Sequence, residues 1–399
     1  MLHPIQTIYY RTYQTFFRMA IPFMPYRKPV LLSDFSQIIT QLRKDSIRSV
    51  LMITGKTVHT SGQTTPLETL LTEAGIHYII YDSTVANPTT DNVEEALSLY
   101  KANHCQAIIG FGGGSPIDCA KAVGARVVKP NKSLAQMKGL LKICKKIPPF
   151  YAIPTTAGTG TETTVTSVIT DARTRDKYPI NDFSLIPHYA ILEPEVTRSL
   201  PAHLTATTGM DALTHAVEAF IGRSTTRQSR KDALEAVRLI FEYLPQAYAD
   251  GNDMNARQQM LYASYLAGSA FTVSYVGYVH AIAHSLGGVY NTPHGLANAV
   301  LLPVVLKAYG CDAYRKLHQL AICIGVSTKD VSAEEGAHAF LDALNDLSKK
   351  LNIPSTIEGI IKEDIPSMAL HAAQEANPLY PVPKLFSAKE LEGIYYKIM

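Results

Sequence analysis

The feature that most restricts the fold is the stretch QAIIGFGGGSPIDCAKAVGA, residues 106–125. A short apolar run leads into Gly112, Gly113 and Gly114, and a segment with helical apolar spacing follows. Glycine permits a tight turn and lets a ligand approach the main chain closely. The stretch therefore predicts a buried strand, a sharp turn and a helix, which is half of a parallel βαβ unit.

The start of this predicted helix is suited to bind an anion. Ser115 is a good N-cap residue, Pro116 stands at the favoured first helical position, and Asp118 can complete a capping box. The uncapped N–H groups and the positive helix end would suit a pyrophosphate. The stretch is not a literal GxGxxG motif, because Ser115 stands where the third glycine would be, so a turn without a ligand is the alternative.

A second polar loop, IPTTAGTGTETT, follows the next predicted strand. It offers the hydroxyls and N–H groups of Thr155, Thr156 and Thr159, although such a loop alone could be an ordinary turn. Two such loops after neighbouring parallel strands would lie at the edge of the sheet where doubly wound folds bind ligands.

The remaining pattern indicates two domains, as expected for 399 residues. Strands and helices alternate up to about residue 200, and long helical stretches follow. We predict a helical extension at 1–30, an α/β domain at 31–200 and an all-helical domain at 201–399. The predicted strands are 49–54, 78–81, 106–111, 151–154, 163–169 (in a hairpin) and 189–193; the predicted helices are 35–43, 67–74, 93–103, 116–128, 206–221, 229–249, 255–269, 279–286 and 296–309.

The N-terminal segment carries a helical apolar stripe of Tyr9, Tyr13, Phe16, Phe17 and Ala20. It lacks the uninterrupted apolar region of a secretory signal, and no apolar run approaches the roughly 20 residues of a membrane span. We expect the stripe to dock on the protein itself or on a partner subunit, in preference to a membrane surface.

The net charge and the cysteines restrict the possible partners and the cellular compartment. The net charge of +3 gives no case for nucleic acid as a partner. The five cysteines are scattered and lack CxxC spacing, which favours reduced thiols in a cytoplasmic protein.

The stretch 208–295 contains candidate metal ligands. Asp211 and His215 are four residues apart in a helical pattern, so they share one helix face, and His280 and His284 repeat this spacing. His294 follows a Gly-Gly and a Thr-Pro, so we expect it on a turn that folds back. A single histidine more often packs in a core, but this combination is hard to obtain from packing alone. One carboxylate and the three imidazoles of His215, His280 and His294 suit Fe²⁺ or Zn²⁺, whereas Mg²⁺ and Ca²⁺ prefer oxygen ligands.

With the motifs GGGSPIDCAK, PTTAGTGTE, GMDALTHAVEAF and HAIAHSLGGVYNTPHG in that order, the sequence resembles the iron-containing (group III) alcohol dehydrogenases. The resemblance implies a Rossmann-like dinucleotide-binding domain, then an all-α domain, in a dehydroquinate synthase-like architecture with the active site in the cleft between them. It implies Fe²⁺, or Zn²⁺, on Asp211, His215, His280 and His294, with His284 as a nearby non-ligating histidine. It also implies a homodimer or larger assembly. The positions that it assigns to the cofactor are Gly55, Asn87, Gly112, Gly113, Gly114, Ser115, Asp118, Thr155, Thr156, Thr159, Val168 and Lys177.

The sequence departs from the family pattern at two places. NAD-using relatives have an Asp that repels a 2′-phosphate where this chain has Gly55, followed by Lys56, so we expect NADP(H) in preference to NAD(H). Val273 and Tyr275 are larger than the residues usual there, and they would narrow the substrate pocket if they line it.

We therefore expect a metal-dependent alcohol dehydrogenase or aldehyde reductase that acts on a small primary alcohol or aldehyde. His284 would pass the proton to solvent, or would only orient a neighbouring group. The alternatives are a zinc polyol dehydrogenase resembling glycerol dehydrogenase, a lyase resembling dehydroquinate synthase, and a non-catalytic metal- or nucleotide-binding protein. The lyase family places a Glu with two His on its metal, so the Asp211/His215 pair argues against it.

Overall fold

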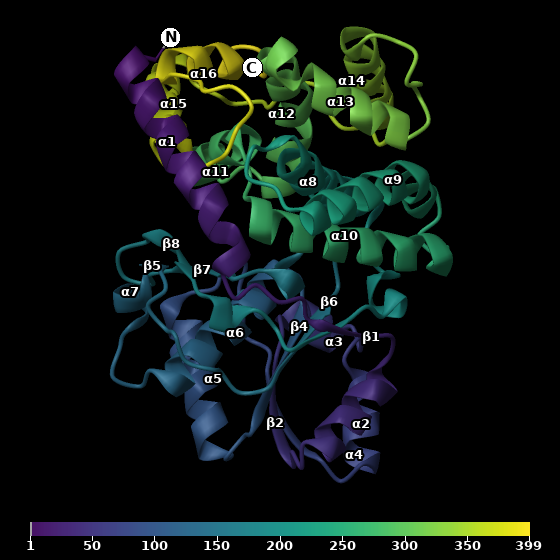
Figure 1. The fold of residues 1–399 in the computed structure, drawn as a ribbon. Coiled ribbons are helices and arrows are strands. Elements are labelled where there is room, and N and C mark those ends of the chain that lie inside the picture. Colours follow the sequence, from purple (N-terminus) through teal and green to yellow (C-terminus); the bar gives the residue numbers. More distant parts are fainter. Residues whose placement is uncertain (1) are drawn as a thin grey trace. The chain divides into compact units, whose positions relative to one another are not determined.

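The computed structural model describes residues 2–399, and they form two compact units (Figure 1). The first unit is Pro25–Ser199. The second unit is Leu200–Met399 together with the N-terminal residues up to Met24.

The first unit is built on a six-stranded sheet in the order β1-β9-β6-β4-β2-β3, and every pairing in it is parallel. Successive residues of β2 belong to different buried clusters: Leu51 packs in one, and Val50 and Met52 pack in the other. Because successive side chains of a strand point to opposite faces, both faces of the sheet are covered. The strands are β1 Val30–Leu32, β2 Ser49–Ile53, β3 His77–Tyr81, β4 Ala107–Gly112, β6 Phe150–Pro154 and β9 Tyr189–Ile191.

Helices and a small second sheet complete this unit, so the predicted α/β fold is confirmed. The second sheet has the order β5-β8-β7, and β7 and β8 form the predicted antiparallel hairpin. Its strands are β5 Gly139–Leu140, β7 Thr166–Thr170 and β8 Lys177–Asn181, and the helices of the unit are α2 Phe35–Lys44, α3 Lys56–Thr60, α4 Thr65–Glu73, α5 Thr90–Ala102, α6 Gly114–Val128 and α7 Leu134–Met137.

The second unit is helical, and among its described residues it contains no strand. Its helices are α1 Pro4–Ala20, α8 Ala202–Ile221, α9 Arg227–Ala249, α10 Met254–Ser274, α11 Tyr278–Tyr290, α12 His294–Tyr309, α13 Cys311–Cys323, α14 Ala333–Lys350, α15 Ile365–Ala376 and α16 Ala388–Tyr395.

Within residues 2–399, no single helix has both the length and the apolar composition to cross a membrane. The pair α10 and α11, bent by 100°, meets that test only when the two helices are taken together, as buried core helices of soluble proteins also do.

Helix α1 docks within its unit, but mainly through residues outside the predicted stripe. Tyr9 and Phe16 are 57% and 65% exposed, whereas Phe17 is half-buried and packs edge-on against Tyr275. The docked face instead centres on Gln14, which is 4% exposed, and on Arg11, which donates to backbone carbonyls of the C-terminal segment. Apolar periodicity could not reveal this face because its principal contacts are hydrogen bonds.

Candidate active site

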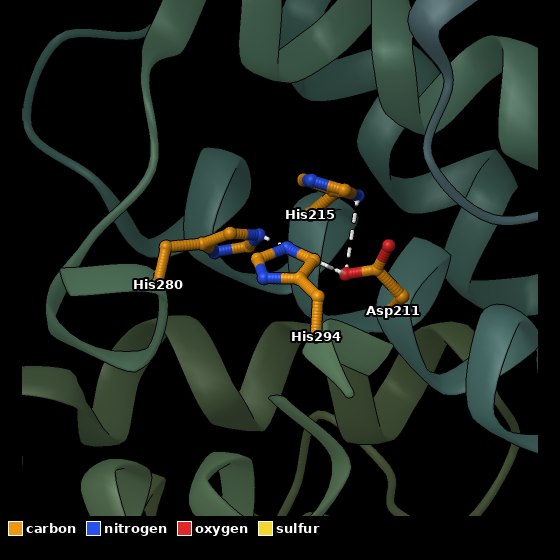
Figure 2. Close-up of side chains that lie close together, drawn as sticks. All are labelled: Asp211, His215, His280 and His294. Atoms are coloured by element: carbon orange, nitrogen blue, oxygen red, sulfur yellow. Dashed lines mark ion pairs between the residues drawn. The ribbon is translucent and has the colours of Figure 1, made fainter. Parts of the chain in front are cut away.

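Four side chains from three helices of the second unit converge on one point (Figure 2). Asp211 and His215 lie one turn apart on α8, His280 lies on α11, and His294 is the first residue of α12. One donor atom from each lies within 4.8 Å of the other three. The Asp211 Oδ1 atom is 3.9 Å from His215 Nδ1, 3.9 Å from His280 Nε2 and 3.5 Å from His294 Nε2.

These separations fit a shared metal ion. Bonds of about 2.0–2.2 Å in a tetrahedral site place neighbouring donors about 3.4 Å apart. One carboxylate oxygen and three imidazole nitrogens are also the donors that Fe²⁺ and Zn²⁺ accept.

The local position of His294 differs from the prediction of a turn. The turn ends earlier: Asn291 adopts a left-handed conformation at the end of α11, and Pro293 is the N-cap of α12. A proline fits at the start of a helix because the N–H that it lacks would make no hydrogen bond within the helix. His294 is therefore held at a helix start.

Glu218, also on α8, fixes the orientation of His280. Its Oε2 atom accepts from the Gly277 N–H at 2.8 Å and lies 2.6 Å from His280 Nδ1, while its Oε1 atom accepts from the Val279 N–H at 2.8 Å. Burial raises the pKa of Glu218 to about 7, against the backbone hydrogen bonds that lower it. Burial also holds the pKa of His280 well below its usual value, which favours a neutral ring whose Nε2 lone pair faces the cluster.

We expect Glu218→Gln to weaken metal binding by about 10–100-fold. A glutamine has only one acceptor oxygen. Its NH₂ group would therefore face either the Val279 N–H, or the Gly277 N–H and His280 Nδ1. Competition with a coloured chelator measures the metal affinity. Glu235→Gln, which removes an exposed carboxylate paired with Arg238, is the control and should leave the affinity unchanged. If Glu218→Gln bound the metal as tightly as the parent enzyme, Glu218 would not orient His280 for metal binding.

Two further residues of the site, Asn298 and Glu375, were not predicted. The Asn298 amide donates to Asp211 Oδ1 at 2.6 Å and lies 3.2 Å from His280 Nε2 and 3.1 Å from His294 Nε2. Asn298 follows His294 by four residues on α12, and this spacing could have identified it. Glu375, which lies 2.7 Å from His284 Nδ1, is 91 positions away in the sequence and gave no such signal.

His284 lies beside the cluster of Asp211, His215, His280 and His294 without belonging to it. Its ring stacks on that of His294, with centroids 5.3 Å apart and an interplanar angle of 15°.

Tyr275, predicted to narrow the substrate pocket, packs against Phe17 of α1. Phe271, a few residues earlier on α10, stacks on the His215 ring at 4.1 Å.

In the first unit, the structure brings the two predicted polar loops together at the ends of β4 and β6. The Thr155 N–H donates to Gly112 O at 3.0 Å. A Cβ atom added at Gly113 would lie 3.7 Å from the Thr156 side chain, and one added at Gly114 would lie 3.5 Å from that of Thr159. At Gly112, where φ is +149°, a Cβ would meet Pro116 at 2.7 Å, so this position requires glycine.

The predicted capping of α6 is wrong. The N-cap is Gly113, the helix begins at Gly114, and no side chain caps it. Ser115 lies inside the first turn and accepts from the Asn87 N–H at 3.2 Å. Asp118 is turned inward, where it accepts from the Val168 N–H at 3.0 Å and the Thr161 hydroxyl at 2.8 Å. These side chains therefore leave the N–H groups at the helix start unused. The turn of Gly112, Gly113 and Gly114, which we call the glycine cradle, remains suited to bind an anion.

The other predicted cofactor positions join the same surface. Lys177 Nζ donates to Asn87 Oδ1 at 2.7 Å, and Asn87 in turn contacts Ser115. Gly55 lies at the end of the neighbouring strand β2, where it is the N-cap of α3 and bridges to Ser83. Close to it, His59 Nδ1 is 2.8 Å from Asp82 Oδ2.

Comparisons with known proteins define the class of this molecule. The family model "Iron-containing alcohol dehydrogenase" matches residues 32–194, and "Fe-containing alcohol dehydrogenase family, C-terminal" matches residues 205–399. The 1,3-propanediol dehydrogenase of Citrobacter freundii is 39% identical over 329 residues, which cover 82% of this chain and 84% of that protein.

Solved structures agree. A crystal structure of a 1,3-propanediol oxidoreductase has a TM-score of 0.89 and 35% identity, and the match covers 94% of this chain and 99% of that one. The sulfoacetaldehyde reductase of Bifidobacterium kashiwanohense, solved with NAD⁺, has a TM-score of 0.84 and 28% identity over 94% of this chain and 98% of its own.

The chain therefore belongs to the iron-containing alcohol dehydrogenase family. It is an oxidoreductase, a metal-dependent alcohol dehydrogenase, as its sequence led us to expect.

Proposed function

We propose that this enzyme reduces small aldehydes to primary alcohols with NADP(H) as hydride donor and Fe²⁺ as its metal. The observation that carries this proposal is the convergence of Asp211, His215, His280 and His294, whose donor atoms lie within 4.8 Å of one another. We assign these four residues as the metal ligands. When bound, the metal would act as a Lewis acid toward the substrate oxygen. Zn²⁺ suits the same donors, and the family description favours iron.

The nicotinamide cofactor, which supplies the hydride, would be held by the first unit. The glycine cradle offers backbone N–H groups to the pyrophosphate of the cofactor, and the loop of Thr155, Thr156 and Thr159 offers N–H groups and hydroxyls. Two hydrogen-bonded groups lie beside that cradle, and we assign both to cofactor binding: Asn87 with Ser115 and Lys177, and Asp118 with Val168.

The preference for NADP(H) rests on the end of β2. No carboxylate stands at Gly55, and Lys56 follows it. The neighbouring carboxylate, Asp82, is engaged by His59, whose hydrogen bond lowers the pKa of Asp82, and the charge of Lys56 lowers it further. A 2′-phosphate would therefore meet Lys56 beside a carboxylate, Asp82, that is already engaged by His59.

We assign His284 the transfer of a proton between the substrate oxygen and solvent: toward the oxygen in aldehyde reduction, and toward solvent in alcohol oxidation. The His284 side chain is 44% exposed, it stacks on a proposed metal ligand, and its Nδ1 atom is held by Glu375. An imidazole can accept and release a proton near neutral pH. Although burial alone would raise the pKa of Glu375, the neighbouring His284 ring and the hydrogen bonds from His284 and Tyr380 lower it, so the carboxylate stays charged and orients the ring.

We expect His284→Ala to keep its metal and to lower kcat by about 100-fold, because His284 moves a proton but does not bind the ion. Metal content and the pH–rate profile of the purified variant measure both effects. Unchanged turnover together with an unchanged profile would show that His284 transfers no proton.

The proposal as a whole is tested by steady-state assays of aldehydes with NADPH and NADH after anaerobic loading with iron or zinc. We expect the iron enzyme with NADPH to be the most active combination. Turnover without net consumption of either reduced cofactor would contradict the proposal and would indicate lyase chemistry.

We also propose that the enzyme is a cytoplasmic homodimer or larger assembly. All five cysteines are free, which suits a reducing compartment, and the family resemblance favours a dimer. Light scattering on the metal-loaded enzyme tests the assembly; a monomer at micromolar concentration would contradict it.

A further inference from the structure

Helix α1 lies outside the residues that either family model matches, yet it contacts the surroundings of His284. We propose that α1 is a positioning element of the active site: Arg11 and Gln14 hold the segment 377–383, and that segment fixes the His284 ring through Tyr380 and Glu375. The inference rests on the proton-transfer role proposed for His284.

The first link is between α1 and a proline-rich segment, NPLYPVP at 377–383. Three of its residues are prolines, which lack an N–H and prevent regular secondary structure, so its carbonyls need donors from elsewhere. Arg11 donates to Val382 O and Pro383 O, each at 2.7 Å. Gln14 donates to Tyr380 O at 2.7 Å and Pro378 O at 3.2 Å. Figure 1 shows α1 alongside this C-terminal part of the chain.

Arg11 and Gln14 act as one group. Arg11 Nη1 also donates to Gln14 Oε1 at 2.8 Å, which fixes the amide so that its NH₂ faces the segment. Burial lowers the pKa of Arg11 to about 10, so the guanidinium remains charged at neutral pH. Buried polar groups destabilise a protein unless they are hydrogen-bonded. A helix that only covered apolar surface would neither bury Gln14 nor partly bury Arg11.

The second link leads from the segment to the catalytic histidine. Tyr380, whose carbonyl Gln14 holds, is 8% exposed, and its hydroxyl donates to Glu375 Oε1 at 2.7 Å. The same oxygen lies 2.7 Å from His284 Nδ1. With two groups directed at it, this oxygen has a fixed position, so the His284 ring has a fixed direction.

A separate contact brings α1 close to the metal cluster. Phe17 packs edge-on against Tyr275, with centroids 5.0 Å apart and an interplanar angle of 89°. Tyr275 joins α10 to α11 with φ at +63°, a conformation that bulky residues rarely adopt and that packing must hold. Two residues later, Gly277 donates to Glu218, which orients His280.

A double-mutant cycle tests the proposal in the full-length, metal-loaded enzyme. Gln14→Ala should lower kcat about fivefold to tenfold, with an unchanged metal content and an unchanged circular dichroism spectrum. Tyr380→Phe, which removes only the hydroxyl, should give the same loss of kcat. This variant replaces Gln14→Ala in the cycle if Gln14→Ala folds poorly. In the His284→Ala background, either change should alter kcat by less than about twofold, because residues that act through one group are not additive. Thr15→Ala, an exposed position on the same helix, is the control.

The outcomes are distinct. Equal losses of kcat in the presence and absence of His284, or no loss in folded Gln14→Ala, would overturn the proposal. If His284→Ala alone left turnover unchanged, the proton-transfer role would fail, and the positioning would be judged by ¹⁵N NMR of histidine-labelled, zinc-loaded enzyme. The His284 ring signals, assigned by their loss in His284→Ala, should shift in Gln14→Ala and Tyr380→Phe and stay in place in Thr15→Ala. If the His284 ring signals did not shift in Gln14→Ala and Tyr380→Phe, the positioning role of α1 would also be overturned.

Discussion

His280→Ala is expected to abolish stoichiometric metal binding and to lower kcat/KM by about 1000-fold or more. His280 supplies one of four donors, and a Lewis acid is worth several kcal/mol of transition-state stabilisation. The loss would also leave Glu218 buried without its imidazole partner. Elemental analysis after dialysis, together with alcohol oxidation and aldehyde reduction assays, measures both effects.

The matched control for His280→Ala is His338→Ala, which changes an exposed histidine on helix α14 that is not part of the cluster. It should keep full metal content and activity. A His280→Ala enzyme with one metal per chain and normal rates would show that the four side chains do not form the metal site.

Gly55→Asp is expected to shift the coenzyme preference from NADPH toward NADH by about 100-fold in the ratio of kcat/KM values. The new carboxylate would repel the 2′-phosphate and could accept a hydrogen bond from a free ribose hydroxyl, a difference of about 2.7 kcal/mol. The backbone allows the change: φ at Gly55 is −99°, and an added Cβ would lie 3.5 Å from Thr84 O, an ordinary contact.

Gly55→Ala separates charge from size in this experiment. It adds the Cβ without the carboxylate, so the NADPH to NADH ratio should change by less than about threefold. Steady-state kinetics with both coenzymes measure the ratio. If Gly55→Asp weakened both coenzymes equally, or if the parent enzyme already preferred NADH, the assignment of the 2′-phosphate to this position would be wrong.

Much of the fold was predictable because its signals are local. The run SVLMI is short, apolar and followed by Thr54 and Gly55, and it is strand β2. The helical spacing around Asp211 and His215 predicted helix α8, which extends four residues further toward the N-terminus than expected. Strand β1 was missed because three residues at a sheet edge, partnered only by the distant β9, show no usable alternation.

The site was predictable where partners lie close in sequence. Asp211 and His215 share a helix, so spacing alone placed them together, and Glu218 on the same helix could have been added by the same rule. The partnership of Glu375 with His284 and the capping of α6 could not be predicted in this way. The first depends on long-range packing of α15 against α11, and the second depends on which backbone conformation Gly113 adopts.

The helical unit is assembled from both ends of the chain, and this has a consequence for biosynthesis. Arg11 emerges from the ribosome 371 positions before Val382, the carbonyl that it will bind. At about 5–20 residues per second, the first helix waits roughly 20–75 seconds for its binding surface, while the intervening α/β unit can already fold. During that interval Ile5, Ile8, Phe16 and Phe23, which stay exposed even in the finished protein, together with the still unsatisfied Arg11 and Gln14, offer chaperones an early target.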